Sequence, residues 1–252
     1  MTSEIAWFDS HIHLHAIPPD AREACIGAGA CAFATAPDDW DAVLQLKYPR
    51  VVRGLGLHPW RVHLFEDNWQ SVMDRLEQHL RDDPTLIVGE IGLDFDPRTP
   101  ADPALQREVF QAQLELALTY DRPCSIHIRK AFDVLYQHLK PFTSLRGSLH
   151  GFGGGLGEAR RFVKLGWKIG ANGIVCRDNA RRYHDLIRGL GLDHLLLETD
   201  GPYVALPGAD QFHCGDIAQI GARVSQLLDL PLESVAQETT RAAQDLFLLR
   251  AS

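Results

Sequence analysis

The chain of 252 residues contains eight short, nearly continuous apolar runs, each followed by a longer segment of mixed polarity. A strand that is apolar along both faces must be covered on both, and parallel strands between helices meet this requirement. Eight such runs, each with a helical segment behind it, favour an α/β fold, a TIM-type (β/α)8 barrel. We expect the strands at residues 7–14, 30–36, 51–58, 86–94, 123–129, 147–152, 168–173 and 195–200.

The segments between the runs show helical spacing, for example in two apolar stripes: Trp69, Val72, Met73, Leu76 and Leu80, and Phe110, Leu114, Ala117 and Leu118. A last amphipathic segment at 232–249 predicts one extra C-terminal helix after the eighth strand. An open, doubly wound sheet is the alternative fold, but no Gly-x-Gly-x-x-Gly follows the first run. Because no linker composition interrupts the pattern, we expect a single domain over residues 1–252.

The formal net charge is −8, from 25 basic and 33 acidic residues. Such a balance disfavours a broad electrostatic footprint on nucleic acid. Arginines outnumber lysines 20 to 5, however, and arginine is the better bidentate ligand for phosphate. Twelve histidines are the unusual feature of the composition, because several stand beside carboxylates in apolar segments.

Five cysteines, at positions 25, 31, 124, 176 and 214, form no Cys-x-x-Cys pair. In a chain of this length we expect them to be reduced and mostly buried rather than a disulfide framework. No run approaches the roughly 18–20 apolar residues of a membrane helix, and no basic segment followed by an apolar stretch stands at the start. We therefore expect a cytoplasmic protein without membrane contact, and no segment predicts an obligate protein partner.

Residues that bind metal ions or phosphate gather at the ends of the predicted strands. In barrels of this type, the carboxyl ends of the strands and the loops that follow them carry the chemistry. The residues in question are His11, His13, His58, Glu90, Asp94, His127, Arg129, His150, Glu198 and Asp200. Because six of the eight strands supply such residues at the same end, we expect one site.

His11 and His13 lie two residues apart, so a strand places both imidazoles on one face. A His-x-His pair alone is weak evidence for a metal, but this pair lies in an apolar segment where a solvent-facing strand is not expected. Glu90 lies within the apolar sequence LIVGEIGLD, where an isolated charge would be costly. It must be paired, protonated or bound to metal, and an ion pair with Arg53 is the structural alternative.

The candidate metal ligands are four imidazoles and two carboxylates: His11, His13, Glu90, His127, His150 and Asp200. They suit two divalent cations if Glu90 bridges the ions and water fills the open positions. Asp200, at a strand tip, can both ligate a metal and take a proton from water. Asp94 and Glu198 share strand faces with Glu90 and Asp200, so we expect them to orient ligands without touching the ions.

Two divalent ions and two carboxylates leave a charge of about +2 at the barrel mouth. An anionic phosphodiester would be attracted there although the whole chain is acidic. Arg129 shares a strand face with His127 and can bind a phosphate or carboxylate. The glycine-rich run at 151–155 can bring backbone amides up to an anion, with Gly153 as a substrate contact, or form only a flexible turn.

Six stretches, in order along the chain, make the sequence similar to the TatD family of metal-dependent deoxyribonucleases, which belong to the amidohydrolase-like barrels. They are FDSHIHLH, GLGLHPW, VGEIGLDF, PCSIHIRKAFD, HGFGGGLGEARRFVKLGWKIG and LLLETDGPY, and they span residues 8 to 203. The resemblance implies a TIM barrel that hydrolyses DNA phosphodiester bonds with divalent metal, commonly as a 3′–5′ exonuclease on single strands.

The resemblance also implies roles for individual residues. His11 and His13 would bind the first metal, and Glu90 would bridge it to the second. His127 and His150 would complete the second metal's ligands. Asp200 would ligate the metal and help to activate the attacking water.

On the substrate side, His58 matches a pocket histidine that contacts phosphate or the leaving oxygen, and Arg129 matches a basic family position. The chain also differs from the family pattern in two places. After His150 the family usually has a cysteine or small residue and a serine, where this chain has Gly-Phe-Gly-Gly. The loop after the eighth strand, LPGADQFHCGDIAQ, lacks the usual Asn-x-Pro-like element.

Imidazole-rich ligation suits Zn²⁺, Mn²⁺ or Co²⁺, whereas Mg²⁺ prefers oxygen ligands. The resemblance implies Mg²⁺ or Mn²⁺ in activity, with Zn²⁺ able to occupy the site. The predicted partner is DNA or another phosphodiester. Two alternatives stay open: an amidohydrolase-type enzyme acting on a small ester, lactone or amide, and a metal-binding module that has lost catalysis. A glutamate rather than a carboxylated lysine on the fourth strand favours the TatD branch.

Overall fold

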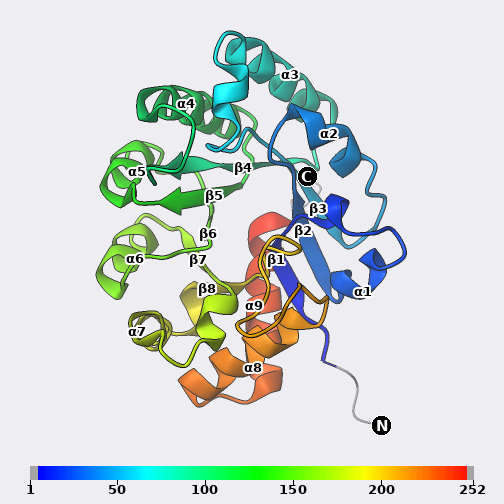
Figure 1. Ribbon diagram of the computed structural model, residues 1–252, viewed down its shortest axis with the longest axis vertical. Coiled ribbons are helices and arrows are strands. Elements are labelled where there is room, and N and C mark those ends of the chain that lie inside the picture. Colours follow the sequence, from blue (N-terminus) through cyan, green and yellow to red (C-terminus); the bar gives the residue numbers. More distant parts are fainter. Residues whose placement is uncertain (1–4, 249–252) are drawn as a thin grey trace.

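The computed structural model describes residues 5–248, in which eight parallel strands pair in chain order (Figure 1). Each strand overlaps one of the predicted apolar runs. The strands are β1 (Phe8–Ile12), β2 (Gly29–Phe33), β3 (Val51–Leu55), β4 (Ile87–Asp94), β5 (Cys124–Arg129), β6 (Gly147–His150), β7 (Lys168–Ala171) and β8 (Leu195–Leu197).

The end of β8 returns to β1 and nearly closes the barrel. The backbone N–H of Asp200 donates to the carbonyl of His11 at 2.9 Å, and the N–H of His13 donates to the carbonyl of Gly201 at 2.7 Å. The predicted TIM-type barrel is confirmed, and its first and last strands meet near their carboxyl ends. Three of the residues in this junction or beside it are candidate metal ligands.

Helices surround the barrel in Figure 1, and the apolar stripes explain how they pack. The α-helices are α1 (Arg22–Ile26), α2 (Pro37–Leu44), α3 (Trp69–Asp82), α4 (Pro103–Thr119), α5 (Phe132–Leu139), α6 (Leu156–Val163), α7 (Arg181–Leu190), α8 (Asp216–Leu228) and α9 (Leu232–Phe247). Short 3-10 turns are η1 (Leu14–Ala16), η2 (Val62–Phe65), η3 (Gly173–Cys176) and η4 (Leu192–His194). No helix among residues 5–248 is long and apolar enough to cross a membrane.

Both predicted stripes form helices that bury apolar faces. In α3, Val72 and Leu76 are buried, as are Phe110 and Leu114 in α4. The stripe prediction was wrong for Leu118, which is 43% exposed in the last turn of α4.

The extra C-terminal helix is confirmed as α9, drawn in red near the centre of Figure 1. It ends at Phe247, and the predicted end at Leu249 lies outside the described residues. Its buried side chains pack with apolar residues of the strands, forming a cluster of Phe8, Cys31, Phe33, Val52, Ile87, Leu196, Ala243, Leu246 and Phe247. Helix α9 therefore covers one end of the barrel with apolar side chains, and the polar residues lie at the other end.

Strand β4 has an irregular register between Val88 and Ile91, where its pairing with β5 shifts. The Ile87 side chain belongs to the apolar cluster that packs against α9. The Glu90 side chain, three residues later, belongs to the polar cluster at the carboxyl end of the barrel, so both side chains lie inside the barrel. Strict alternation would place side chains three residues apart on opposite faces. The shift therefore allows Glu90 to enter the barrel. Gly92, at φ +150°, lets β4 approach β5 closely, because a Cβ there would lie 2.0 Å from the His127 carbonyl oxygen.

Cys25 in α1 and Cys214 ahead of α8 form a disulfide bond across 189 residues. The prediction that the cysteines are reduced was therefore wrong for this pair, whereas Cys31, Cys124 and Cys176 are free thiols. The reason is tertiary. Helix α1 follows β1 and the loop at 201–215 follows β8, so closing the barrel brings the two segments together.

We expect Cys25→Ser to destabilise the protein, because the bond closes a long loop and limits the unfolded ensemble. A loss on the order of 2–5 kcal/mol is typical, which at this chain length corresponds to a melting temperature roughly 5–15 °C lower. Thermal unfolding followed by circular dichroism without reductant measures the difference, and Cys176→Ser is the matched control. Equal melting temperatures for Cys25→Ser and the wild type would contradict this role.

Candidate metal centre

The Glu90 carboxylate, 3% exposed, lies at the centre of a ring of imidazoles at the carboxyl end of the barrel. Five histidine nitrogens lie near its oxygens, at 2.5 Å (His150 Nε2), 3.1 Å (His58 Nε2), 3.2 Å (His127 Nδ1) and 3.5 Å (Nε2 of both His11 and His13). Arg53 pairs instead with Asp83 at 2.8 Å, so the alternative of a core ion pair between Arg53 and Glu90 is excluded.

The rings come from separate strands that the barrel brings together. His127 and His150 are register partners on β5 and β6. His11 lies on β1, and His13 follows its end. His58 follows β3 at the same edge of the sheet. Convergence at the carboxyl ends of parallel strands therefore places all five imidazoles in one small volume.

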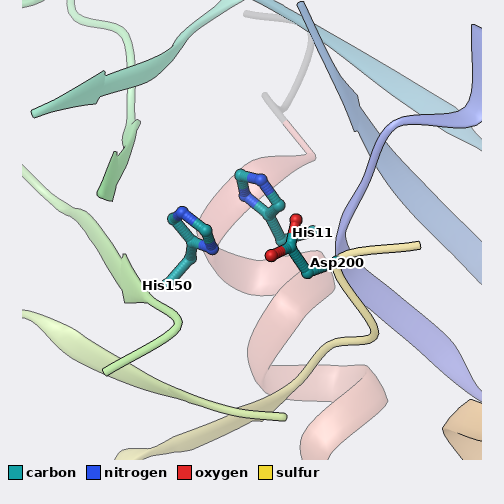
Figure 2. A group of neighbouring side chains, drawn as sticks. All are labelled: His11, His150 and Asp200. Carbon is teal, nitrogen blue, oxygen red and sulfur yellow. The ribbon is translucent and has the colours of Figure 1, made fainter. Parts of the chain in front are cut away.

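Asp200 supplies the second carboxylate of the cluster, from the turn after β8. Figure 2 shows it beside the rings of His11 and His150. The two rings stack with their centroids 3.8 Å apart and an angle of 7° between their planes. Asp200 Oδ1 also lies 3.3 Å from His13 Nε2. Three overlapping groups can each hold a metal ion: His11, His150 and Asp200; His11, His13 and Glu90; and His58, Glu90 and His127.

The hydrogen bonds of His11 and His13 leave a ring nitrogen of each directed at the centre. His13 Nδ1 lies 3.0 Å from the Phe33 carbonyl, which can only accept, so Nδ1 carries a proton. Its Nε2 faces Asp200 Oδ1 at 3.3 Å and Glu90 Oε2 at 3.5 Å, and a metal ion bound there would take the place of the proton that Nε2 donates to Asp200. His11 Nδ1 lies 2.8 Å from Ser125 Oγ, and its buried Nε2 has no hydrogen-bond partner. An unpartnered buried imidazole nitrogen beside a carboxylate is what a metal site requires.

The pKa values of two rings differ in a way that affects metal binding. Burial, together with the nearby His150, lowers the pKa of His11 to about 3, so this ring is neutral at pH 7. Burial also acts to lower the pKa of His150, but the charge and hydrogen bond of Glu90 outweigh it and raise that pKa to about 10. A cation that binds His150 must therefore displace a proton, which makes its affinity depend on pH.

Asp94, at the end of β4, holds His127 in place. Its Oδ2 lies 3.0 Å from His127 Nε2 and accepts from Trp60 Nε1 at 2.7 Å. Gln106 fixes the backbone of Asp94 through two hydrogen bonds of 2.9 Å. Partial burial acts to raise the pKa of Asp94, but the bonds from His127 and Trp60 lower it to about 2. The ionised Asp94 therefore orients His127 with Nδ1 toward Glu90.

Glu198, fully buried, lies below the imidazoles and bonds to the backbone next to His150. Its Oε1 accepts from the Gly151 N–H at 2.5 Å, and burial raises the pKa of Glu198 to about 8. The carboxylate fits against Gly170, where a Cβ would lie 2.1 Å from Glu198 Oε2. It thus positions the residue after a candidate ligand rather than the imidazole itself.

Among the predicted substrate contacts, the structure brings only His58 into the cluster. The Arg129 side chain is 45% exposed, with its guanidinium 3.2 Å from the Asp96 carboxylate. Gly153 is exposed, and its carbonyl accepts a hydrogen bond from Arg182. In the same glycine-rich run, the amides of Gly151 and Gly155 donate to carboxylates of the chain, those of Glu198 and Glu158.

Sequence reasoning missed several groups that orient the site, among them the side chains of Ser125 and Trp60. Ser125 lies two residues before His127, so the two-residue period of the strand already placed it in the barrel. Trp60 follows His58 in the sequence GLHPW, but no local pattern links it to Asp94, which is 34 residues away. The Phe33 carbonyl that fixes His13 could be found only from the structure.

A TIM-type barrel with buried imidazoles and carboxylates at the carboxyl ends of its strands defines a metal-dependent hydrolase. The chain belongs to the TatD-related DNase family, whose model matches residues 8–248. The resemblance noted in the sequence is thereby confirmed.

Two relatives are informative: the first matches almost the whole chain, and the name of the second states an activity. The uncharacterized metal-dependent hydrolase YjjV of Escherichia coli is 34% identical and covers 96% of this chain and 97% of its own length. The crystal structure of YjjV has a TM-score of 0.86, with 32% identity and coverage of 96% and 98%. The 3′-5′ ssDNA/RNA exonuclease TatD of Edwardsiella piscicida is 38% identical over 59% of this chain and 57% of its own length.

We expect the stability of the metal-free protein to fall as the pH rises from about 4.5 to about 8, partly because of Glu198. Between these pH values the Glu198 carboxyl is protonated in the folded protein and ionised in the unfolded chain. Because the unfolded state binds fewer protons, the free energy of unfolding decreases as the pH rises. Glu198→Gln removes this titration and can still accept from Gly151. Its melting temperature should exceed that of the wild type by several degrees at pH 8 and by less at pH 5. Glu158→Gln, in the first turn of α6, is the control, because Glu158 also accepts from a glycine N–H of the glycine-rich run. Equal pH slopes for Glu198→Gln and the wild type would refute the role of Glu198.

Proposed function

We propose that the protein hydrolyses phosphodiester bonds of DNA, removing nucleotides from the 3′ end of single strands. The observation that carries this proposal is the cluster in which one buried carboxylate, Glu90, contacts imidazoles from four strands or strand ends and lies near Asp200. The exonuclease name of the Edwardsiella piscicida relative supports the polarity and the substrate.

In this proposal the cluster holds two divalent ions, Mg²⁺ or Mn²⁺ in activity, although Zn²⁺ can also occupy it. Glu90 would contribute to both ions, while His11, His13 and Asp200 would hold one of them and His127 and His150 would hold the other. Two ions bound here would lower the pKa of a water molecule and stabilise negative charge on the phosphoryl and leaving oxygens. The unpartnered Nε2 of His11 and the orientation of His13, whose Nε2 faces Glu90 and Asp200, support this assignment.

Asp200 is the proposed base that takes the proton of the attacking water. Burial acts to raise its pKa, but the hydrogen bond from His13 and the charge of His150 lower it below the usual value. The carboxylate is therefore ionised at neutral pH and can accept a proton. His58, whose side chain keeps some exposure beside Glu90, is the proposed contact to the phosphate or the leaving oxygen. Asp94 and Glu198 position His127 and the His150 segment.

A second candidate function is hydrolysis of a small phosphate ester, carboxylic ester or lactone at the same centre. This alternative is favoured because two residues predicted to contact a nucleic-acid substrate do not reach the cluster. Arg129 forms an ion pair with Asp96, and Gly153 is exposed outside the cluster. A protein that binds metal without catalysis is the third alternative, and a variant of Asp200 distinguishes it from both enzymes.

We expect the wild type with Mg²⁺ or Mn²⁺ to shorten a 5′-labelled single-stranded DNA from its 3′ end in a time course. Asp200→Asn should lower the rate by at least about 100-fold, because a positioned base typically contributes that much, and EDTA should abolish cleavage. Asp229→Asn, an exposed carboxylate in α8's C-terminal turn, is the matched control. A metal-loaded wild type that leaves the DNA intact would refute the nuclease proposal, and small phosphate esters and lactones would be tested next.

Metal content tests the bridging role of Glu90. We expect two ions per chain in the wild type after equilibration with Mn²⁺ or Zn²⁺, fewer than one in Glu90→Gln, and about one in His127→Ala. Inductively coupled plasma mass spectrometry measures the content, with Asp229→Asn as control. Retention of two ions by Glu90→Gln would show that this residue does not bridge them.

A further inference from the structure

A groove of about 550 Å³ lies beside the metal centre, between two loops that the barrel closure brings together. One wall comes from the segment before α1, with Ile17 and Pro18. The other comes from the loop after β8, with Pro202, Tyr203 and Phe212. Its volume is in the range of pockets that bind small organic ligands. None of the roles assigned above uses this groove.

Tyr203 connects the groove to the candidate metal centre. Its ring lines the groove, lies with its centroid 4.8 Å from that of His13, and is 63% exposed. It follows Asp200 by three residues, and its N–H donates to the Asp200 carbonyl at 3.1 Å. A group that stacks on this ring would therefore lie next to His13, one of the candidate metal ligands.

The charge of the groove indicates which part of a substrate fits it. Among the described residues that line it there is no lysine or arginine; Asp210 contributes a carboxylate and His213 an imidazole. A second phosphate would therefore lack the lysine and arginine partners through which nucleic-acid backbones are mainly bound. Aromatic and proline side chains instead offer surfaces for a neutral planar ring.

We propose that this groove binds the nucleobase of the nucleotide whose phosphate lies at the metal centre. This inference rests on the proposed function and deepens it. The base stacks on Tyr203, the sugar spans from the groove to the centre, and the 5′ phosphate of that nucleotide is the group attacked. One base beside one scissile phosphate suits removal of a terminal nucleotide. Stacking also tolerates any base, because every base has a π-face.

Contacts at both ends of the loop hold the groove in a fixed position relative to Asp200. The Phe212 ring packs against Gly201, where a Cβ would lie 2.2 Å from it, and the Gly201 carbonyl accepts from the His13 N–H. At the far end, the Cys25–Cys214 disulfide joins this loop to α1 behind the opposite wall. A groove held in this way loses little conformational freedom on binding, which favours affinity.

Two esters with the same scissile bond test the proposal: thymidine 5′-(4-nitrophenyl phosphate) and methyl 4-nitrophenyl phosphate. Both release 4-nitrophenolate, so damage to the metal centre cancels in the ratio of their kcat/KM values. We expect the wild type to prefer the thymidine ester, and Tyr203→Ala to lower this preference about tenfold, the usual effect of losing one base–aromatic stack. Tyr203→Phe keeps the ring and should keep the preference. Tyr120→Ala, at the C-terminal end of α4 and away from the groove, is the matched control.

Binding of thymidine to the metal-free protein gives a readout that does not depend on catalysis. We expect calorimetric titration to detect binding to the wild type and to Tyr203→Phe, and none to Tyr203→Ala. Equal ester preferences in the wild type and Tyr203→Ala, with thymidine binding unchanged, would overturn the groove proposal. If a metal-loaded wild type cleaves neither ester nor single-stranded DNA but binds thymidine at Tyr203, the phosphodiesterase proposal fails while the base-binding groove stands.

Discussion

The burial of one carboxylate among imidazoles is the interaction on which this site depends. Glu90 lies inside a barrel whose other end is apolar, where an isolated charge would be strongly unfavourable. Contacts with five histidines compensate for that burial, and each of these rings has a position set by the strand that carries it. The same carboxylate belongs to two of the residue groups that can hold a metal ion, so stability of the fold and the capacity to bind metal depend on one residue.

The two ends of the barrel differ in composition: one is apolar and stabilises the fold, and the other carries the polar candidate site. Helix α9 fills the amino end with apolar side chains such as Leu246 and Phe247, and that end contributes hydrophobic stability. The carboxyl end carries the polar cluster, and the hydrogen bonds that nearly close the barrel there come from the backbone of His11, His13 and Asp200. Closing the sheet and assembling the site are therefore one structural event.

The loop after β8 contributes residues to the candidate metal centre, the groove and the disulfide bond. It begins at Asp200 in the metal centre, continues through Pro202 and Tyr203 along the groove, and ends at Cys214, which the disulfide joins to Cys25. This is also one of the two segments whose sequence differs from the family pattern noted above. In barrels of this architecture, a centre at the strand ends supplies the chemistry, and variation in the neighbouring loops allows different substrates.

The sequence by itself determined the eight strands, the extra helix and the candidate ligands at the strand ends, because strand burial, helical periodicity and the two-residue alternation are local properties. Only the tertiary structure decided how Glu90 enters the barrel, because the register shift in β4 depends on pairing with β5. Long-range closure likewise decided that Cys25 meets Cys214. The bond from Trp60 to Asp94 joins residues from different strand ends, and no local pattern records such a contact. Spacing along the chain specifies which face a side chain takes, whereas its partner depends on how distant segments are packed.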